Sequence, residues 1–105
     1  MAPNTRVYGG PGTQVCAGEN LSIVTLNEST QLSSRPGRLI KVRWVTAGTS
    51  WVVTVYDDPS ANNNAVYTET SVTAQTIREL GYPMSQGVRV VTSGTTPGEV
   101  HIVWS

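Results

Sequence analysis

The residue types that most often do chemistry in enzymes are few in this chain and stand far apart. His101 is the single histidine and Cys16 the single cysteine. A zinc site needs several His, Cys or acidic ligands, and a reactive thiolate needs a neighbour that lowers its pKa. Neither residue has such a partner close in sequence. We therefore predict no metal, no cofactor and no catalytic residue, and we interpret the chain as non-enzymatic.

The acidic residues and the glycines add no recognisable motif. The seven acids are dispersed, so a pair of catalytic carboxylates would arise only by accident of folding. Asp57 and Asp58 lack the spaced ligands and the closing Glu of a calcium loop. The run Gly9-Gly10-Pro11-Gly12 lacks the Lys-Ser/Thr ending that a phosphate loop requires. A solvated turn is the better interpretation of the aspartates.

The three tryptophans are a possible platform for sugar stacking. Trp44, Trp51 and Trp104 nevertheless fall on faces that period-two alternation assigns to the core. Core packing is therefore the better interpretation for at least two of them.

Two similar stretches would position most of these residues. Residues 38–57 hold two runs rich in Val, Trp and Tyr around the Gly-containing insert Thr46–Ser50, which predicts a β-hairpin. Residues 88–96 repeat residues 42–50 with only the third, sixth and ninth positions changed. The sequence therefore predicts two hairpins that face each other.

Alternation assigns a face to each side chain of the first stretch. Ile40, Val42 and Trp44 share one face, and Lys41 and Arg43 share the other. We expect Lys41 and Arg43 to project away from the core and to be candidates for a protein contact. The core faces of the second stretch are then Val88, Val90, Val100, Ile102 and Trp104.

The remaining segments complete an all-β pattern. Short strands are expected at residues 21–26, 30–33 and 65–70, and residues 72–82 are expected to be extended, with a helical turn at 77–80 as the alternative. About seven strands at roughly ten-residue spacing predict an antiparallel two-sheet β-sandwich, jelly-roll-like, and a small barrel is the alternative. The sandwich would be one domain over residues 20–105.

Residues 1–19 have a different composition, rich in Gly and Pro with little apolar content. Such a segment cannot sustain a long regular element, so we predict an extended N-terminal arm. A disordered tail is the alternative. Arg6 and Tyr8 are the arm's candidates for a contact with a neighbouring subunit.

Composition excludes several kinds of partner. The formal net charge is zero and charged residues make up 13% of the chain, about half of the roughly 25% typical of soluble proteins. No basic stripe or apolar run indicates a nucleic acid or a membrane. Six Arg, one Lys, three Trp and four Tyr are typical of protein interfaces, although a short chain can reach this balance by chance. The first residues lack the apolar core of a signal peptide, which favours synthesis in a cytoplasm.

The motif RLIKVRWVTAGTSWVVTVYD at residues 38–57, with YPMSQGVRVVTSGTTPG at residues 82–98, resembles a group of small all-β virion proteins of tailed bacteriophages. The resemblance covers about residues 38–105 and not the arm. It implies a capsid decoration (cement) protein or head-fibre component that is commonly oligomeric, with a trimer favoured. Its partner would be the major capsid protein, and its place the exterior of the virion, after synthesis in the host cytoplasm. The resemblance thus makes Arg6, Tyr8, Lys41 and Arg43 candidates for a contact with the capsid or with a sister subunit.

Two other functions stay open at this stage. A receptor- or carbohydrate-binding fibre module would expose aromatic residues, for example Tyr67 and Tyr82 beside the Asn62–Asn64 loop. A tail or connector accessory protein would differ from a decoration protein in its copy number per particle.

Overall fold

The structure is a computed structural model of the 105-residue chain. It describes the backbone of residues 5–7 and 13–105, and the side chains of residue 13 and residues 15–105. This part of the chain is all-β and contains no helix. The strands are β1 (Thr5–Val7), β2 (Gln14–Cys16), β3 (Asn20–Val24), β4 (Ser29–Ser33), β5 (Gly37–Thr46), β6 (Val52–Tyr56), β7 (Ala65–Thr70), β8 (Thr76–Met84), β9 (Val88–Ser93) and β10 (Glu99–Trp104).

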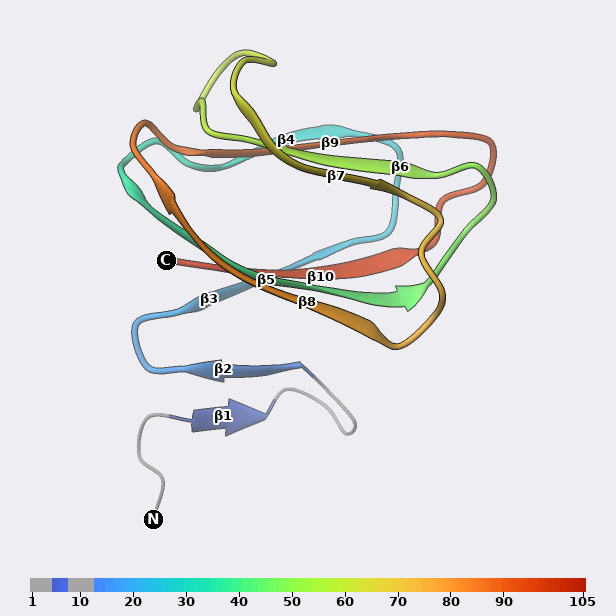
Figure 1. Ribbon diagram of the computed structural model, residues 1–105, viewed down its shortest axis with the longest axis horizontal. Coiled ribbons are helices and arrows are strands. Elements are labelled where there is room, and N and C mark those ends of the chain that lie inside the picture. Colours follow the sequence, from blue (N-terminus) through green and yellow to red (C-terminus); the bar gives the residue numbers. More distant parts are fainter. Residues whose placement is uncertain (1–4, 8–12) are drawn as a thin grey trace.

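Eight of these strands form two antiparallel sheets of four that face each other (Figure 1). The first sheet has the order β3-β10-β5-β8 and the second the order β4-β9-β6-β7. The predicted two-sheet sandwich is therefore confirmed at this level. The extended interpretation of residues 72–82 is confirmed for residues 76–82, which lie in β8 (Thr76–Met84), whereas residues 74–75 form a turn.

The two predicted hairpins are wrong in their pairing. β5 and β6 lie in different sheets, and so do β9 and β10. Each stretch crosses from one sheet to the other, and the two stretches pair with each other: β5 with β10, and β6 with β9. Two apolar strands joined by a short loop can bury their apolar faces in two ways: as a hairpin within one sheet, or as strands of two sheets that pack across a core. The strand-loop-strand pattern is the same in both arrangements and did not distinguish them.

The two crossing loops contact one another, which explains their repeated glycines. The amide of Thr49 donates to the carbonyl of Thr96 at 2.9 Å, and the amide of Thr96 donates to the carbonyl of Thr49 at 3.1 Å. Gly48 has a φ of 68°, and a Cβ there would stand 2.5 Å from the Thr96 carbonyl oxygen. Glycine thus permits both the left-handed backbone and the close approach.

The core lies between the two sheets and matches the predicted faces with one shift. Trp44 and Trp51 are fully buried and pack edge to face, with ring centroids 5.7 Å apart. Leu39 is buried where Ile40 was predicted to be, because the register of β5 against β10 shifts between Val103 and Trp104. A bulge of this kind moves the following side chains to the other face. The buried core is Val24, Leu39, Val42, Trp44, Trp51, Val53, Val55, Tyr67, Met84, Val88, Val90, Val100 and Ile102.

The N-terminal segment folds back on itself, although a single extended arm was predicted. β1 pairs antiparallel with β2, with Thr5 opposite Cys16 and Val7 opposite Gln14. Figure 1 shows β2 beneath the outer face of the β3-β10-β5-β8 sheet. Val15 is 2% exposed, and Val103, which points outward from that sheet, is fully buried. The segment therefore covers part of one outer face of the sandwich.

Candidate interaction surfaces

The outer face of the β3-β10-β5-β8 sheet carries a polar cluster, which we call the anchor cluster. Its buried members are Thr13, Arg43 and His101, and the more exposed Gln75 and Glu99 flank them. Arg43 and His101 are register partners on β5 and β10. The Thr13 hydroxyl lies 2.5 Å from Nδ1 of His101 and accepts a hydrogen bond from Nη1 of Arg43 at 3.4 Å. Arg43 also donates to Oε1 of Gln75 at 2.6 Å, and Nε2 of His101 lies 2.7 Å from Oε2 of Glu99.

The anchor cluster corrects the prediction for Arg43. Arg43 points away from the core, as alternation required, but it is only 9% exposed because the N-terminal segment covers it. It is therefore not a free surface contact. Lys41, two residues earlier on the same face, is half-buried.

The other two predicted contact residues cannot be placed. Tyr8 lies outside the described residues, and so does the side chain of Arg6. Their predicted contact with the capsid or a sister subunit stays a prediction.

The anchor cluster places a hydroxyl, an imidazole and a carboxylate in a row. This order of groups is the one that activates a nucleophile in hydrolases. Thr13 is, however, only 3% exposed and is held by both Arg43 and His101. In this arrangement the cluster fixes the N-terminal segment to the sheet by satisfied buried hydrogen bonds.

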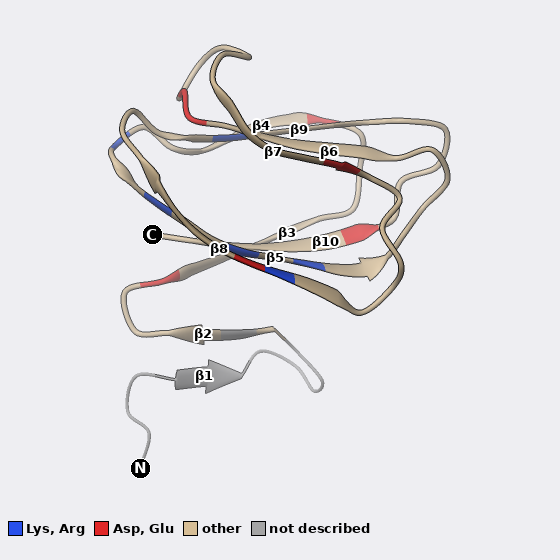
Figure 2. Cartoon of the chain, viewed as in Figure 1, with Lys and Arg blue, Asp and Glu red and all other residues tan. Residues whose placement is uncertain are grey.

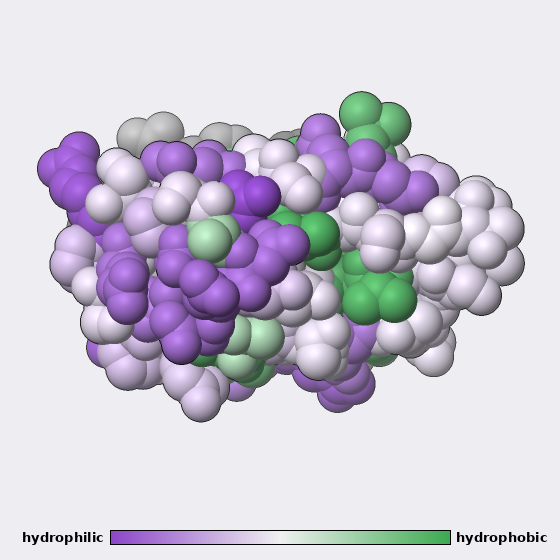
Figure 3. Space-filling view, turned by 90° about the horizontal axis from the view of Figure 1, so that it is seen from above, coloured by the Kyte–Doolittle hydropathy of each residue, from purple (hydrophilic) through white to green (hydrophobic). Residues whose placement is uncertain are grey.

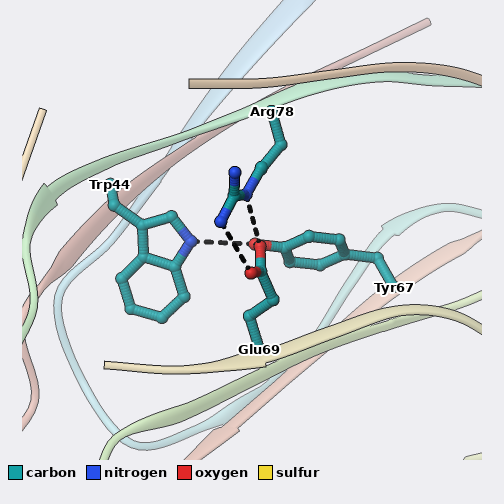
Figure 4. A network of polar contacts seen from close by, with 4 residues as sticks. All are labelled: Trp44, Tyr67, Glu69 and Arg78. Carbon is teal, nitrogen blue, oxygen red and sulfur yellow. Dashed lines mark hydrogen bonds and ion pairs between the residues drawn. The ribbon is translucent and has the colours of Figure 1, made fainter. Parts of the chain in front are cut away.

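A second polar network joins the two sheets at the edge formed by β7 and β8 (Figure 4). Nε1 of Trp44 donates to the Tyr67 hydroxyl at 2.8 Å, and that hydroxyl donates to Oε1 of Glu69 at 2.7 Å. Arg78 of β8 binds both oxygens of Glu69, at 2.8 and 3.0 Å. The hydrogen bond from Arg78 holds the pKa of Glu69 below its ordinary value, and burial raises the pKa of the Tyr67 phenol. We call this network of Trp44, Tyr67, Glu69 and Arg78 the clamp, because it links the two sheets at this edge.

Asp57 fixes the turn that leads into β9. Its carboxylate accepts hydrogen bonds from the Ser85 amide and hydroxyl at 2.9 and 3.0 Å, and from the Gln86 amide at 2.8 Å. Burial by itself raises the pKa of Asp57, but these hydrogen bonds outweigh it and leave the pKa below its ordinary value. Asp57 thus stabilises a turn outside its own loop, whereas Asp58 accepts hydrogen bonds from the Ser60 and Ala61 amides within that loop.

Charge is distributed unequally between the two sheets (Figure 2). The strands of the β4-β9-β6-β7 sheet contain two charged residues, Glu69 and Arg89. The strands of the other sheet contain six, namely Arg38, Lys41, Arg43, Arg78, Glu79 and Glu99.

The outer face of the β4-β9-β6-β7 sheet, which we call the open face, has no further described strand packed on it. Its half-exposed Thr54 and exposed Thr68 are register partners with their hydroxyls 3.0 Å apart. Val52, Tyr56 and Val91 are half-exposed on the same face. Figure 3, which looks down on this side of the molecule, shows a small apolar area among polar groups. A face with few charges and some apolar surface is suited to a protein contact.

A polar groove of about 510 Å³ lies at the edge opposite the clamp, where β3 and β4 leave the sandwich open. Nε1 of Trp104 donates to the Ser22 hydroxyl at 3.0 Å, and the Asn20 amide donates to the Trp104 carbonyl at 3.4 Å. The lining residues are Asn20, Gln31, Leu32, Ser33, Ser34, Arg35, Pro36, Trp104 and Ser105. Sequence reasoning did not find this groove, because its walls come from three separate strand ends with no shared motif.

The two tyrosines named as candidates for a fibre module differ in their exposure. Tyr82 is 47% exposed, but Tyr67 is 8% exposed and belongs to the clamp. Trp44 and Trp51 are core residues, as predicted, whereas Trp104 packs against the core and also lines the groove.

Two simple kinds of site are not found in the described part of the chain. No group of three or more His, Cys, Asp or Glu side chains there could hold a metal ion. Nor do the described residues form any helix long and apolar enough to cross a membrane.

Comparison with known proteins finds no matching family model, no matching curated protein and no matching solved structure.

Proposed function

We propose that the chain is a non-enzymatic structural protein of a bacteriophage virion that binds the capsid surface and stabilises it, as a decoration or cement protein does. The observation that carries the proposal is the open face. It is a broad β-surface with few charges, and Val52, Tyr56 and Val91 are half-exposed on it. The resemblance of residues 38–105 to small phage virion proteins supports the same function.

The strand order supports a jelly-roll topology, which we include in the proposal. Strands that are neighbours in sequence face each other across the core: β3 and β4, β10 and β9, β5 and β6, β8 and β7. Eight strands in two such sheets are the arrangement of jelly rolls, a fold used by viral capsid domains and lectins.

Stabilisation of the capsid follows from mass action. A protein that binds the assembled shell and not its separated subunits adds its binding free energy to the work of opening the shell. An interface of standard size buries about 800 Å² on each partner, which one face of a small sandwich can supply. The major capsid protein is the proposed partner, and a homo-oligomer, with a trimer favoured, would place several open faces on the shell at once.

A substitution on the open face tests the proposal. Thr54→Lys and Val91→Asp each add a charge to this face without touching the core, and we expect capsid occupancy to fall at least tenfold. Glu79→Lys, on the other sheet, is the control and should bind as the unchanged protein does. Cosedimentation with capsids that lack the protein measures occupancy, and equal binding of all three variants would overturn the role of the open face.

Removal of the N-terminal segment is a poor test of the arm. Deletion would uncover Val103 and leave Arg43 and His101 without Thr13, so reduced binding could reflect unfolding. Tyr8→Ala and Arg6→Ala address the proposed arm contact directly, and unchanged occupancy of both variants would remove the arm from the interface.

The alternatives predict different copy numbers and ligands. A tail or connector accessory protein would be present in few copies per particle, whereas a decoration protein is expected in hundreds. Counting copies in images of intact particles therefore separates these two functions. A receptor- or carbohydrate-binding fibre module predicts a ligand site, and Tyr67, one of the residues named for it, is buried.

A further inference from the structure

We infer that the groove at the β3/β4 edge is a binding site for a small saccharide. It lies at the edge of the sandwich where β4 borders the open face, and one of its lining residues, Gln31, is the register partner of Arg89 on that face. The inference does not depend on that proposed function.

Trp104 gives the groove an aromatic wall held in a fixed position. Its Nε1 is bonded to Ser22 of the neighbouring strand, and its ring packs against the core cluster. The half-buried ring also lines the groove. An aromatic ring that is anchored on one side and accessible on the other can stack against the apolar C–H face of a sugar ring.

The groove is also lined by polar side chains whose donors and acceptors are not used by other described residues. Gln31, Ser34 and Arg35 are exposed and line the groove, and no described residue bonds their side chains. Gln31 belongs to β4, and the turn that carries Ser34 and Arg35 is stabilised by local hydrogen bonds. The Ser33 hydroxyl accepts from the Arg35 amide and donates to the Arg35 carbonyl, both at 3.2 Å. Donors and acceptors are thus presented from a preorganised loop, which lowers the entropic cost of binding.

Size and chemistry together favour a saccharide. The volume of about 510 Å³ falls in the range of roughly 300–1,000 Å³ that is usual for small-molecule sites. A single aromatic ring among amides and hydroxyls matches a ligand with many hydroxyl groups and a few C–H faces. An apolar ligand would leave these amides and hydroxyls buried without partners, which is costly.

Arg35 decides between two kinds of saccharide. It carries the only charged side chain among the residues that line the groove. A guanidinium donates to the hydroxyls of a neutral sugar, and it binds the carboxylate of a uronic or sialic acid in bidentate fashion. The shared ligand is a saccharide, and the test below separates neutral from acidic forms.

The test uses the full chain and four soluble probes: lactose, sialyllactose, glucose and glucuronic acid. Titration calorimetry is expected to show binding of at least one probe in the millimolar range or tighter. Trp44 and Trp51 are fully buried, so a change of tryptophan emission on binding should come from Trp104. It should disappear in Trp104→Phe, which keeps an aromatic ring in the same place.

Substitution of Arg35 locates the site. Arg35→Ala should weaken binding about tenfold or more, as loss of a charged hydrogen bond does. The matched control Arg89→Ala lies outside the groove lining and should bind as the unchanged protein does. A loss in Arg35→Ala that is larger for sialyllactose than for lactose supports an acidic saccharide, and an equal loss supports a neutral one. No binding of any probe, or binding that neither Arg35→Ala nor Trp104→Phe changes, would overturn the inference.

Discussion

Arg43 and Arg89 occupy the same position in the two copies of the repeated stretch, yet their surroundings differ. Both point outward from a strand, and both follow a buried valine, Val42 or Val88. Arg43 is 9% exposed beneath the N-terminal segment. Arg89 is half-exposed on the open face and donates through Nε to the Asn62 side chain at 2.9 Å.

This difference shows which property the local sequence controls. The alternation within each copy sets the face on which the arginine lies, and it is the same in both. The burial is set by a segment far away in the chain, since Thr13 stands 30 residues before Arg43. Two nearly identical strands therefore have one covered outer face and one open outer face.

The largest expected effect is at the crossing loops, which contain the glycine shared by the two copies. A Cβ at Gly94 would overlap the Ser50 carbonyl oxygen, and a Cβ at Gly48 would crowd the Thr96 carbonyl oxygen. Both glycines also have positive φ, at 156° and 68°. Strain and overpacking add, so Gly94→Ala and Gly48→Ala should each lower the free energy of unfolding by about 3 kcal/mol. Urea unfolding measures this.

Gly18 supplies the control for the loop substitutions. Its φ is 85°, but a Cβ there would meet nothing within 4 Å. Gly18→Ala should therefore cost only the backbone strain, about 1 kcal/mol. If all three variants lost the same free energy, the close approach of the two loops would not contribute.

The next effect contrasts the two arginines themselves. Arg43→Ala should lower the free energy of unfolding by about 2 kcal/mol, because it removes a charged hydrogen-bond donor from the buried Thr13 hydroxyl and also the hydrogen bond to Gln75. Arg89→Ala should cost less than about 0.5 kcal/mol, as surface substitutions usually do. Unfolding midpoints in urea compare the pair, and equal losses would show that the N-terminal segment does not bury Arg43 in solution.

The same contrast marks the limit of prediction from the sequence. Period-two alternation was enough to assign Val42 and Trp44 to the core and Arg43 to the outside, because alternation is a local property of a strand. It was not enough to predict that β5 pairs with β10, since loop length and composition allow either a hairpin or a crossing. The groove beside Trp104 was equally hidden, because residues distant in sequence meet there only after the strands have paired.

The two edges of the sandwich also differ from each other. The clamp closes the β7/β8 edge, and the groove leaves the β3/β4 edge open. Glu69→Gln removes the charge that Arg78 and the Tyr67 hydroxyl bind. The ion pair is partly exposed, with Arg78 at 44% and Glu69 at 28%, so solvent screens it and the expected loss is only about 1 kcal/mol. Thermal unfolding measures it. Gln31→Ala at the open edge is the control and should have almost no effect.

The smallest effect is a dependence of stability on pH at the turn that Asp57 holds. The pKa of Asp57 is lower in the folded chain than its ordinary value, so the carboxylate stabilises the fold above that ordinary value. This contribution is lost as the pH falls through the folded pKa. We expect Asp57→Asn to cost about 0.5 to 1 kcal/mol at pH 7 and less at pH 3, because the contribution of the carboxylate declines once the pH is below its ordinary pKa. Urea unfolding at both pH values measures the difference. A cost that is the same at pH 3 and pH 7 would mean that the charge of Asp57 does not hold the turn, and that the amide of Asn accepts the Ser85 and Gln86 hydrogen bonds no worse than the carboxylate.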